Sequence, residues 1–561
     1  MYQALYYCNE EKQYYLRDDR NDSFKTIKYW PTYFLPDEDG EHFTLEGTRV
    51  SPVRKIDDWR DTRYFEKDVD KITRFLVDHY YETDDTPKTH NIIYLDIECV
   101  VAGALTEENI KDPKGEITAI ALYDHNTKKY FCLVLDKSNK MSKAESEGKI
   151  IMPFSSEKEL LSGFLDKWYE LDPTIITGWN SGFFDIPYLY YRIKKVLGET
   201  VANTLSPIGK IKFTPQFPEQ PVNLAGINHL DYMLLFKKYI MKQEPSYRLG
   251  DIGKKYAKLE KIEYQGSLDK LFAEDVDKYI EYNLRDVEII VELENRMKFI
   301  DLTVTIAHLC HTEYEAIYFS TMLNEGAILT YLKRKGIISP NKPTTYNPSL
   351  RTLEEEYAGG YLLDPKPGLY RWIIDDDYSS LYPSIIRSLN LGIETYVGRI
   401  LDRIIKEDCW WGLDDLKKMN PERIISIENK KQKQTTIKVS ELIKMIEDNN
   451  FTISASGAMF RTDKQSVVCE ILADWFAKRQ DYKKMMKQAY MSGDKTKGDF
   501  YNSRQHSYKI LLNSVYGVFA INSWRYTDGR KILSSAITLT GQRMIKETIK
   551  QANEIMEELL K

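Results

Sequence analysis

Asp377-Tyr378-Ser379-Ser380-Leu381-Tyr382-Pro383-Ser384-Ile385-Ile386 marks a change from strand to helix in the second half of this 561-residue chain. The apolar run that begins at Trp372 predicts a strand that ends at Asp377 and opens an α/β unit. A turn follows, and its backbone N–H groups, notably those of Ser380 and Leu381, can surround an anionic group. The acidic run formed with Asp375 and Asp376 also fits an exposed turn.

Lys509-Ile510-Leu511-Leu512-Asn513-Ser514-Val515-Tyr516-Gly517 is a second informative stretch. It overlaps the second of two helices, predicted over 467–488 and 499–515, which form an antiparallel pair. Polar and aromatic side chains that can meet between them are Arg479, Lys483, Lys509, Asn513 and Tyr516. Solvated helix faces often carry such lysines. However, residues 476–509 hold nine Lys or Arg against three Asp on a chain of net charge −6, a balance that favours a local phosphate-binding surface.

A pair of carboxylates follows an apolar run in the first half of the chain. The stretch is Ile93-Tyr94-Leu95-Asp96-Ile97-Glu98. On a strand over 91–100, side chains alternate between faces, so Asp96 and Glu98 share one face. Ile93, Leu95 and Ile97 lie on the other. Two adjacent carboxylates repel unless a cation lies between them, and Mg²⁺ or Mn²⁺ prefers such oxygen ligands. Asp-x-Glu also occurs on solvated strand edges.

Two later segments supply further acidic residues. Asp185 begins a predicted helix over 185–198, with Pro187 in its first turn, and helix capping is a compatible alternative role. Tyr282 and Asp286 lie four residues apart on a helix predicted over 276–300 and therefore share a face.

Together these segments resemble the proofreading 3′→5′ exonuclease domain of family B DNA polymerases, which has an RNase H-like fold. The resemblance implies two ions, Mg²⁺ or Mn²⁺, about 3.5 to 4 Å apart in the site. The implied metal ligands are Asp96, Glu98, Asp185 and Asp286. Tyr282 is implied to orient the attacking water.

The two stretches quoted first resemble the palm and fingers of family B polymerases. The resemblance implies a second pair of metal ions at Asp377 and Tyr378, and a ring at Tyr382 that leaves no room for a ribose 2′-hydroxyl. The implied nucleotide-binding residues are Ser380, Leu381, Tyr382, Arg479, Lys483, Lys509, Asn513, Tyr516 and Gly517.

The predicted fold class is α/β multidomain: an RNase H-like 3′→5′ exonuclease domain, a partial family B palm and helical fingers. Residues 400–450, charged and lysine-rich with helical fragments, are interpreted as an insertion in the palm. The predicted domains are a β-rich domain over 1–90 completed by about 301–350, the exonuclease over 91–300, the partial palm over 351–464, the fingers over 465–515 and a palm continuation over 516–561.

The chain looks like the N-terminal portion of a T4-like bacteriophage family B DNA polymerase. Because no Asp-Thr-Asp triplet follows the second stretch, we expect a split polymerase in which a second polypeptide supplies the rest of the palm and the thumb. The expected partners are primer-template DNA, deoxynucleoside triphosphates, that second chain and, through it, a sliding clamp.

The alternatives are a self-sufficient exonuclease whose other half only grips DNA, a non-catalytic DNA-binding remnant, and a laboratory truncation. No apolar run in the sequence is long enough to span a bilayer, and no signal sequence begins it. Its six cysteines include no Cys-x-x-Cys pair. We therefore expect the protein to act in the cytoplasm of an infected bacterium and to have no membrane partner.

Overall fold

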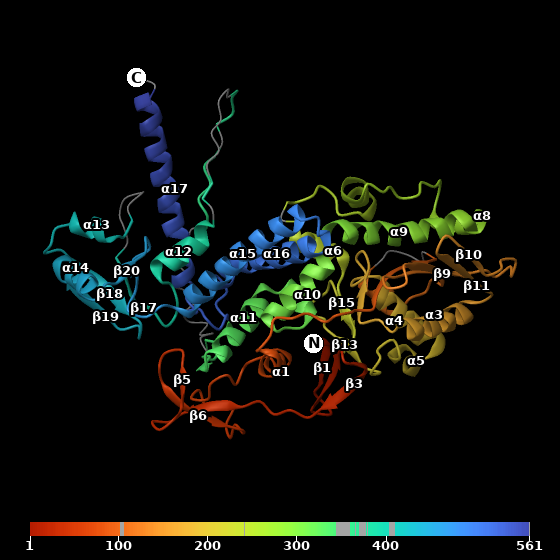
Figure 1. Cartoon of the computed structure of the whole chain (residues 1–561), viewed down its shortest axis with the longest axis horizontal. Helices are drawn as coiled ribbons and strands as arrows, with labels where there is room; N and C mark the ends of the chain where they lie inside the picture. Colours follow the sequence, from red (N-terminus) through yellow and green to blue (C-terminus); the bar gives the residue numbers. More distant parts are fainter. Residues whose placement is uncertain are drawn as a thin grey trace. The chain divides into compact units, whose positions relative to one another are not determined.

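The computed structural model describes residues 1–100, 106–240, 242–343, 359–364, 366–369, 377–378, 380–402 and 410–559. The chain divides into two compact units, coloured by sequence in Figure 1. Unit 1 comprises residues 1–30 and 83–319, and unit 2 comprises residues 31–82 and 320–561. The predicted domain over 1–90 is therefore divided between the two units. The other predicted domain boundaries stay predictions.

Unit 1 is built on a seven-stranded sheet with the order β10-β11-β9-β8-β7-β12-β15. Its strands are β7 (Ile92–Cys99), β8 (Ile117–Asp124), β9 (Lys129–Leu135), β10 (Ala144–Ser146), β11 (Lys149–Phe154), β12 (Ile175–Thr177) and β15 (Asn228–His229). β7, β8 and β9 form an antiparallel meander, whereas β12 pairs in parallel with both β7 and β15. The α/β class and the strand predicted over 91–100 are confirmed.

Helices cover both faces of this sheet. Figure 1 shows α9 on one side of it and α3 with α4 on the other. The helices of unit 1 are α2 (Glu107–Lys111), α3 (Glu157–Leu171), α4 (Asp185–Leu197), α5 (Glu199–Asn203), α6 (Tyr232–Tyr239), α7 (Leu249–Ile252), η1 (Gly253–Ala257), α8 (Leu268–Glu274), α9 (Val276–Met297), α10 (Phe299–Cys310) and η2 (Tyr314–Tyr318). Fully buried Leu160, Leu161 and Phe164 of α3 belong to the core beneath the sheet.

The helix predicted over 276–300 is broken near its end. Lys298 adopts a left-handed conformation, φ 57°, and its N–H donates to the carbonyl of Glu294, which ends α9. The Glu294 carboxylate then accepts the N–H of Ile300, at 3.2 Å, in the first turn of α10. The buried carboxylate thus joins two helices where periodicity alone indicated one.

Two smaller sheets complete unit 1. The first has the order β1-β2-β3, and the second is the hairpin β13-β14. Their strands are β1 (Tyr2–Cys8), β2 (Gln13–Asp18), β3 (Asn21–Ile27), β13 (Ile211–Phe213) and β14 (Val222–Leu224). The Tyr2 hydroxyl fixes the N-terminal strand by donating to the carbonyls of Ala307 and Thr312.

Unit 2 contains a four-stranded sheet with the order β16-β5-β6-β4, in which β16 pairs in parallel with β5. Its strands are β4 (Tyr33–Pro36), β5 (His42–Thr44), β6 (Arg49–Val53) and β16 (Ile337–Ile338). The helices of this unit outside residues 391–460 are α1 (Lys71–Tyr80), α11 (Ser320–Arg334), α12 (Leu381–Leu389), α15 (Val467–Met491), α16 (Lys495–Phe519) and α17 (Ile532–Leu559).

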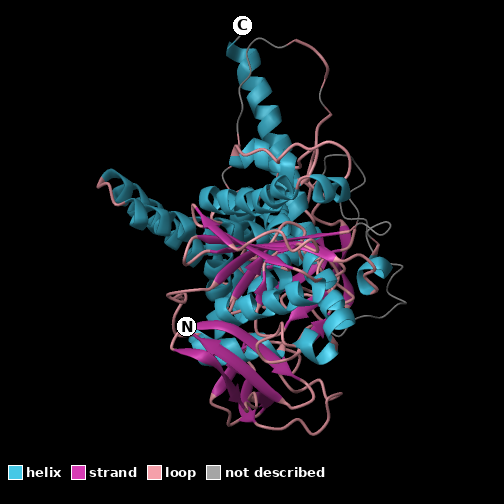
Figure 2. Ribbon diagram, turned by 90° about the vertical axis from the view of Figure 1, so that its right-hand side faces the viewer, coloured by secondary structure: helices cyan, strands magenta, loops and turns pink. Residues whose placement is uncertain are grey.

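The sequence predicted α15 and α16, and the structure confirms both. α15 and α16 are antiparallel neighbours joined by a short turn. α17 extends past the other elements of unit 2 (Figures 1 and 2), and its side chains from Gln551 to Leu559 are exposed. None of the helices in the described ranges combines the length and apolar character needed to cross a bilayer.

Residues 391–460 contain two helices, in agreement with the helical fragments predicted over 400–450, but also strands that were not predicted. They form a five-stranded antiparallel sheet with the order β19-β18-β17-β21-β20. Its elements are β17 (Tyr396–Ile400), α13 (Leu413–Lys417), β18 (Ile424–Asn429), β19 (Gln434–Lys438), α14 (Val439–Asp448), β20 (Thr452–Ile453) and β21 (Ala458–Phe460). Leu442 and Ile446 of α14 pack with Ile425 in an apolar core of their own. The sheet was not predicted because its strands are short, polar residues interrupt their apolar ones, and a lysine-rich turn joins two of them.

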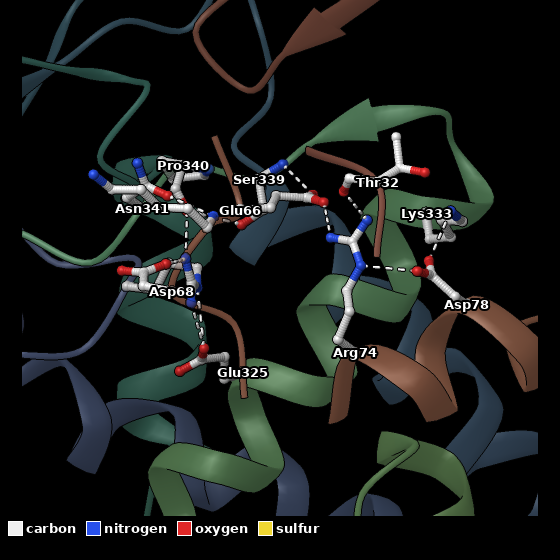
Figure 3. Close-up of polar contacts among 12 residues, drawn as sticks. Thr32, Glu66, Asp68, Arg74, Asp78, Glu325, Lys333, Ser339, Pro340 and Asn341 are labelled. Atoms are coloured by element: carbon white, nitrogen blue, oxygen red, sulfur yellow. Dashed lines mark hydrogen bonds and ion pairs between the residues drawn. The ribbon is translucent and has the colours of Figure 1, made fainter. Parts of the chain in front are cut away.

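A buried polar network joins three distant segments of unit 2 (Figure 3). The Arg525 guanidinium, fully buried, donates to Asp68 at 2.5 Å, to Glu325 at 2.7 Å and to the Pro340 carbonyl at 2.7 Å. Figure 3 shows the Glu66 carboxylate between Arg74 and the Ser339 N–H, and it accepts hydrogen bonds from both. Buried charges of opposite sign thus fix residues 66–78 against α11 and the segment after α16.

Candidate active site

β7 presents two carboxylates on the face opposite its core residues. Ile93, Leu95 and Ile97 are 0%, 1% and 3% exposed, whereas Asp96 and Glu98 are half-buried. The two carboxylates thus share one face of the strand, as its period of two predicted.

α9 brings a third carboxylate to the same place. Carboxylate oxygens of Asp96, Glu98 and Asp286 all lie within 4.8 Å of one another. Oδ2 of Asp286 accepts a hydrogen bond from the Lys261 ammonium at 2.6 Å, while its buried Oδ1 has no hydrogen-bond partner. Lys261 also lies 3.1 Å from the hydroxyl of Tyr282, so the predicted pair on α9 shares one cation.

Asp185 lies beside this cluster but outside the group of three. It begins α4, 3% exposed, and its Oδ1 accepts the backbone N–H of Ile97 at 3.0 Å. The cap residue of α4 is Phe184, which makes no side-chain capping bond, so the alternative capping role for Asp185 is wrong. Its hydrogen bond instead ties the helix start to the strand that carries the other two carboxylates.

Hydrogen bonds to the Asp231 carboxylate fix the loop before α4. This buried carboxylate accepts the N–H groups of Asn180, at 3.2 Å, and Gly182, at 2.9 Å, and it also caps α6. A side chain at Gly182 would meet the Glu219 carbonyl at 2.7 Å, so only glycine fits this close approach. The position of Asp185 is therefore set by its neighbours on both sides.

Burial and mutual repulsion make the carboxyl groups weak acids in this metal-free arrangement. Burial, and then the charge of Asp286, raises the pKa of Glu98 to about 8. Burial raises the pKa of Asp185 to about 7, and it raises that of Asp96 well above its ordinary value, with Asp286 as the next cause. Lys261 opposes these effects by lowering the pKa of Asp286, although burial still leaves that pKa raised.

The residues present fit a divalent cation. They offer hard carboxylate oxygens at short mutual distances, and one buried oxygen of Asp286 lacks a donor. A cation would relieve the repulsion that raises these pKa values. Among the described residues, this is the one group of three or more acidic, histidine or cysteine side chains close enough to share an ion.

The residues predicted to bind a nucleotide lie in unit 2. The rings of Tyr382, on α12, and Tyr516, on α16, stack with centroids 4.2 Å apart. Gly541 of α17 lies under this stack, since a side chain there would meet Tyr382 at 3.2 Å. The two quoted stretches, far apart in sequence, therefore meet through these aromatic rings.

Two of the charged residues predicted to bind a nucleotide, Arg479 and Lys509, lie near His506. The charges of Lys509 and Arg479, after burial, lower the pKa of His506, which places both cations near it. Burial also lowers the pKa of Arg479, whose buried Nε has no hydrogen-bond partner. Lys509, Asn513 and Gly517 are exposed and Lys483 is half-buried.

The residues around Asp377 are only partly described. Asp377 and Tyr378 are exposed, and the Tyr378 hydroxyl hydrogen-bonds with that of Thr548. Ser380 has a left-handed conformation, φ 59°, before the first residue of α12, Leu381. The predicted strand before Asp377, together with Asp375, Asp376 and Ser379, lies outside the described residues.

Sequence reasoning missed two members of the site in unit 1. Lys261 lies in a loop without periodicity, and Asn283 lies on the predicted helix of Tyr282 and Asp286 but was given no role. The Asn283 amide donates to Oδ2 of Asp96 at 2.7 Å. A polar residue on the side of α9 that faces the sheet was the signal that could have identified it.

Comparison with known proteins gives matches in both units. The model of DNA polymerase family B matches residues 316–561, and that of the family's exonuclease domain matches residues 68–252. The DNA-directed DNA polymerase of Enterobacteria phage T4 is 24% identical, over 97% of this chain and 65% of that protein. The enzyme of the same name from Escherichia phage RB69 is 26% identical, over 73% of this chain and 47% of its own length.

A third relative, DNA polymerase 1 of Saccharolobus solfataricus, is 25% identical over 96% of this chain and 57% of its own length. The chain thus spans about half to two thirds of the length of these relatives. The exonuclease-domain match contains Asp96, Glu98 and Asp185 but ends before Asp286, and the polymerase match contains Tyr382 and Tyr516. The chain belongs to family B of the DNA polymerases.

Proposed function

We propose that unit 1 is a proofreading exonuclease that removes nucleotides from the 3′ end of DNA. The observation that carries this proposal is the group of Asp96, Glu98 and Asp286 within 4.8 Å, with Asp185 tied to the same strand. Closely spaced carboxylates of this kind suit phosphodiester hydrolysis assisted by divalent ions. The exonuclease-domain match over residues 68–252 supports the same reaction class.

Some of these side chains would bind the ions, and others would orient the attacking water or stabilise charge. Asp96, Glu98, Asp185 and Asp286 would hold Mg²⁺ or Mn²⁺, and a bound ion supplies an activated water and charge stabilisation at the phosphate. The Tyr282 hydroxyl, 3.1 Å from Lys261, orients the water for attack in line with the scissile bond. Lys261 supplies positive charge beside the phosphate oxygens as the negative charge develops.

The test is degradation of 5′-labelled single-stranded DNA by the purified chain with Mg²⁺ or Mn²⁺. Shortening from the 3′ end is expected, and the double substitution Asp96→Ala, Glu98→Ala abolishes it. The matched control is Glu557→Ala, Glu558→Ala, which removes an exposed acidic pair on α17. Undiminished cleavage by the first double variant would show that another nuclease site, or a contaminant, is responsible.

We also propose that unit 2 binds primer-template DNA and deoxynucleoside triphosphates as part of a DNA-directed DNA polymerase. The Tyr382–Tyr516 stack, and the two cations near His506, favour it. A self-sufficient exonuclease and a non-catalytic DNA-binding remnant remain the alternatives. The second polypeptide, its sliding clamp and the cytoplasm of an infected bacterium stay predictions.

A co-expression experiment tests the polymerase proposal. The chain is produced with a candidate second polypeptide that carries an Asp-Thr-Asp hairpin, and the complex is assayed for primer extension. Extension that disappears with Asp377→Ala supports the proposal. Extension that persists in this variant removes Asp377 from the site.

A further inference from the structure

The Asn283 side chain is fully buried at the carboxylate cluster. It lies on α9, three residues before Asp286, and is 0% exposed. Its Nδ2 lies 2.7 Å from Oδ2 of Asp96 and 3.4 Å from the Asp96 carbonyl. Both contacts run from one helix to one residue of β7, so the amide joins the two elements that carry the cluster.

Three of the four carboxylates at the site accept from different kinds of donor. Asp286 accepts from the Lys261 ammonium, and Asp185 accepts from a backbone N–H. Asp96 accepts from the neutral amide of Asn283. An amide donor fixes the direction of one carboxylate oxygen without adding a positive charge that would compete with a bound cation.

The fixed oxygen determines which oxygen remains for an ion. Oδ2 of Asp96 accepts a hydrogen bond from the amide, and one carboxylate oxygen of Asp96 lies within 4.8 Å of oxygens of Glu98 and Asp286. Without the amide, we expect repulsion among the three carboxylates to turn the Asp96 side chain away from the other two. The geometry needed for a shared ion would then have to be created at the moment of binding.

We propose that Asn283 is the positioning residue for Asp96, which holds the carboxylate in its metal-binding orientation before any ion arrives. The inference rests on the proposed exonuclease function, because it assigns a role within that same metal site. It places Asn283 outside the residues that touch the DNA or the ion, and its effect passes through the Asp96 side chain alone.

Simple packing is the competing explanation. The other end of the amide offers little, since Oδ1 lies 4.0 Å from the Cys132 sulfur, a weak donor. If Asn283 only filled space between α9 and the sheet, leucine of similar size would replace it without effect on ion binding. The two explanations therefore predict different ion affinities for the variants but the same effect on their stability.

The experiment titrates Mn²⁺ into the metal-free full chain and follows the free ion by electron paramagnetic resonance. Asn283→Leu keeps the volume and removes the donor, and Asn283→Asp keeps the shape but replaces the donor with a carboxylate. We expect each to weaken the binding of Mn²⁺ by about 10- to 100-fold, the range for residues that orient metal ligands. Should Asn283→Leu fail to fold, Asn283→Asp decides the question.

Glu294→Gln provides the matched control. Glu294 is also buried on α9 and hydrogen-bonded, but its partners are Tyr232 and Ile300 rather than the cluster. We expect it to lower the melting temperature while Mn²⁺ affinity stays within about twofold of the wild type. Wild-type affinity in a folded Asn283 variant would overturn the proposal.

Failure of this inference is distinguishable from failure of the proposed function. The same titration on Asp96→Ala, Glu98→Ala shows whether the cluster binds Mn²⁺ at all. If that double variant binds Mn²⁺ as the wild type does, the metal site itself is wrong. If it loses binding while the Asn283 variants retain theirs, only the positioning role is wrong.

Discussion

The Lys261 ammonium lies 2.6 Å from Oδ2 of Asp286, so the carboxylate cluster carries its own cation. Lys261 is partly accessible, with 32% of its side chain exposed, whereas the Asp286 side chain is 6% exposed. The partly exposed ammonium of Lys261 therefore neutralises the buried carboxylate of Asp286. This arrangement links the stability of the metal-free protein to the chemistry of the site.

Lys261→Met should destabilise the metal-free protein by about 1 to 3 kcal/mol, because it leaves a buried carboxylate with one partner fewer. Added Mg²⁺ should shrink this difference, since a bound ion takes over the neutralisation. Urea unfolding with and without Mg²⁺ measures both effects. Lys254→Met, which removes an exposed pair with Glu260, should change the unfolding free energy by less than about 0.5 kcal/mol.

Arg525→Met should lower the unfolding free energy of unit 2 by about 3 to 5 kcal/mol, because Asp68 and Glu325 lose the cation that they share. Arg525→Lys should recover part of the loss, since one ammonium cannot reach every acceptor of the guanidinium. Thermal unfolding with a probe in unit 2 measures the change. The control is Lys430→Met, whose partner Glu46 is 54% exposed; an equal loss there would mean that burial of the pair does not matter.

Tyr382→Ala should admit ribonucleotides more readily in a complete polymerase that contains this chain. The substitution removes the ring that stacks on Tyr516 and opens space for a 2′-hydroxyl, so discrimination falls through loss of a clash. Incorporation of paired ribo- and deoxynucleotides measures the ratio. An unchanged ratio would remove Tyr382 from the discrimination of sugars.

His90 should make the stability of unit 1 depend on pH. Its ring lies 3.0 Å from the Thr174 hydroxyl and 3.1 Å from that of Tyr314, and burial lowers its pKa from 6.5 to about 4. As the pH falls, His90 is therefore protonated in the unfolded chain while it is still neutral in the folded protein. The stabilisation is complete above pH 6.5 and is lost as the pH falls towards 4.

The test compares the wild type with His90→Gln by urea unfolding between pH 7 and 4. Because other groups titrate in both proteins, the difference between the two isolates the histidine. The wild type should lose up to about 1.4 kcal/mol per pH unit more than the variant below pH 6.5. Parallel curves would show that the ring is protonated equally in the folded and unfolded states.

The parts of the molecule that sequence predicted have strong local signals. The shared face of Asp96 and Glu98 follows from the period of two of a strand, and the helix that carries Asp286 follows from its own period. Lys261 has no such signal, because its role depends on where a loop crosses the site. The partnership of Asn283 with Asp96 likewise depends on tertiary packing between α9 and β7.

The sheet over residues 391–460 was missed for a different reason. β19, Gln434–Lys438, is mostly exposed, and the lysines of the tight turn before it suggested a charged helical surface. The apolar residues that do specify the sheet, such as Ile425 in β18, are separated by polar ones whose period of two was too short to outweigh the charge.

The contact between Arg525 and Asp68 spans 457 residues of sequence, and this sets an order of events during synthesis. At 5 to 20 residues per second, the ribosome needs roughly 20 to 90 s to make the second partner after the first. For the first part of that time β16 has not been made, so the edge of β5 that pairs with it is exposed beside unpaired carboxylates. Substitutions in residues 31–82 should therefore appear first as a lower yield of folded protein, before any change in the rate of the chemical reaction.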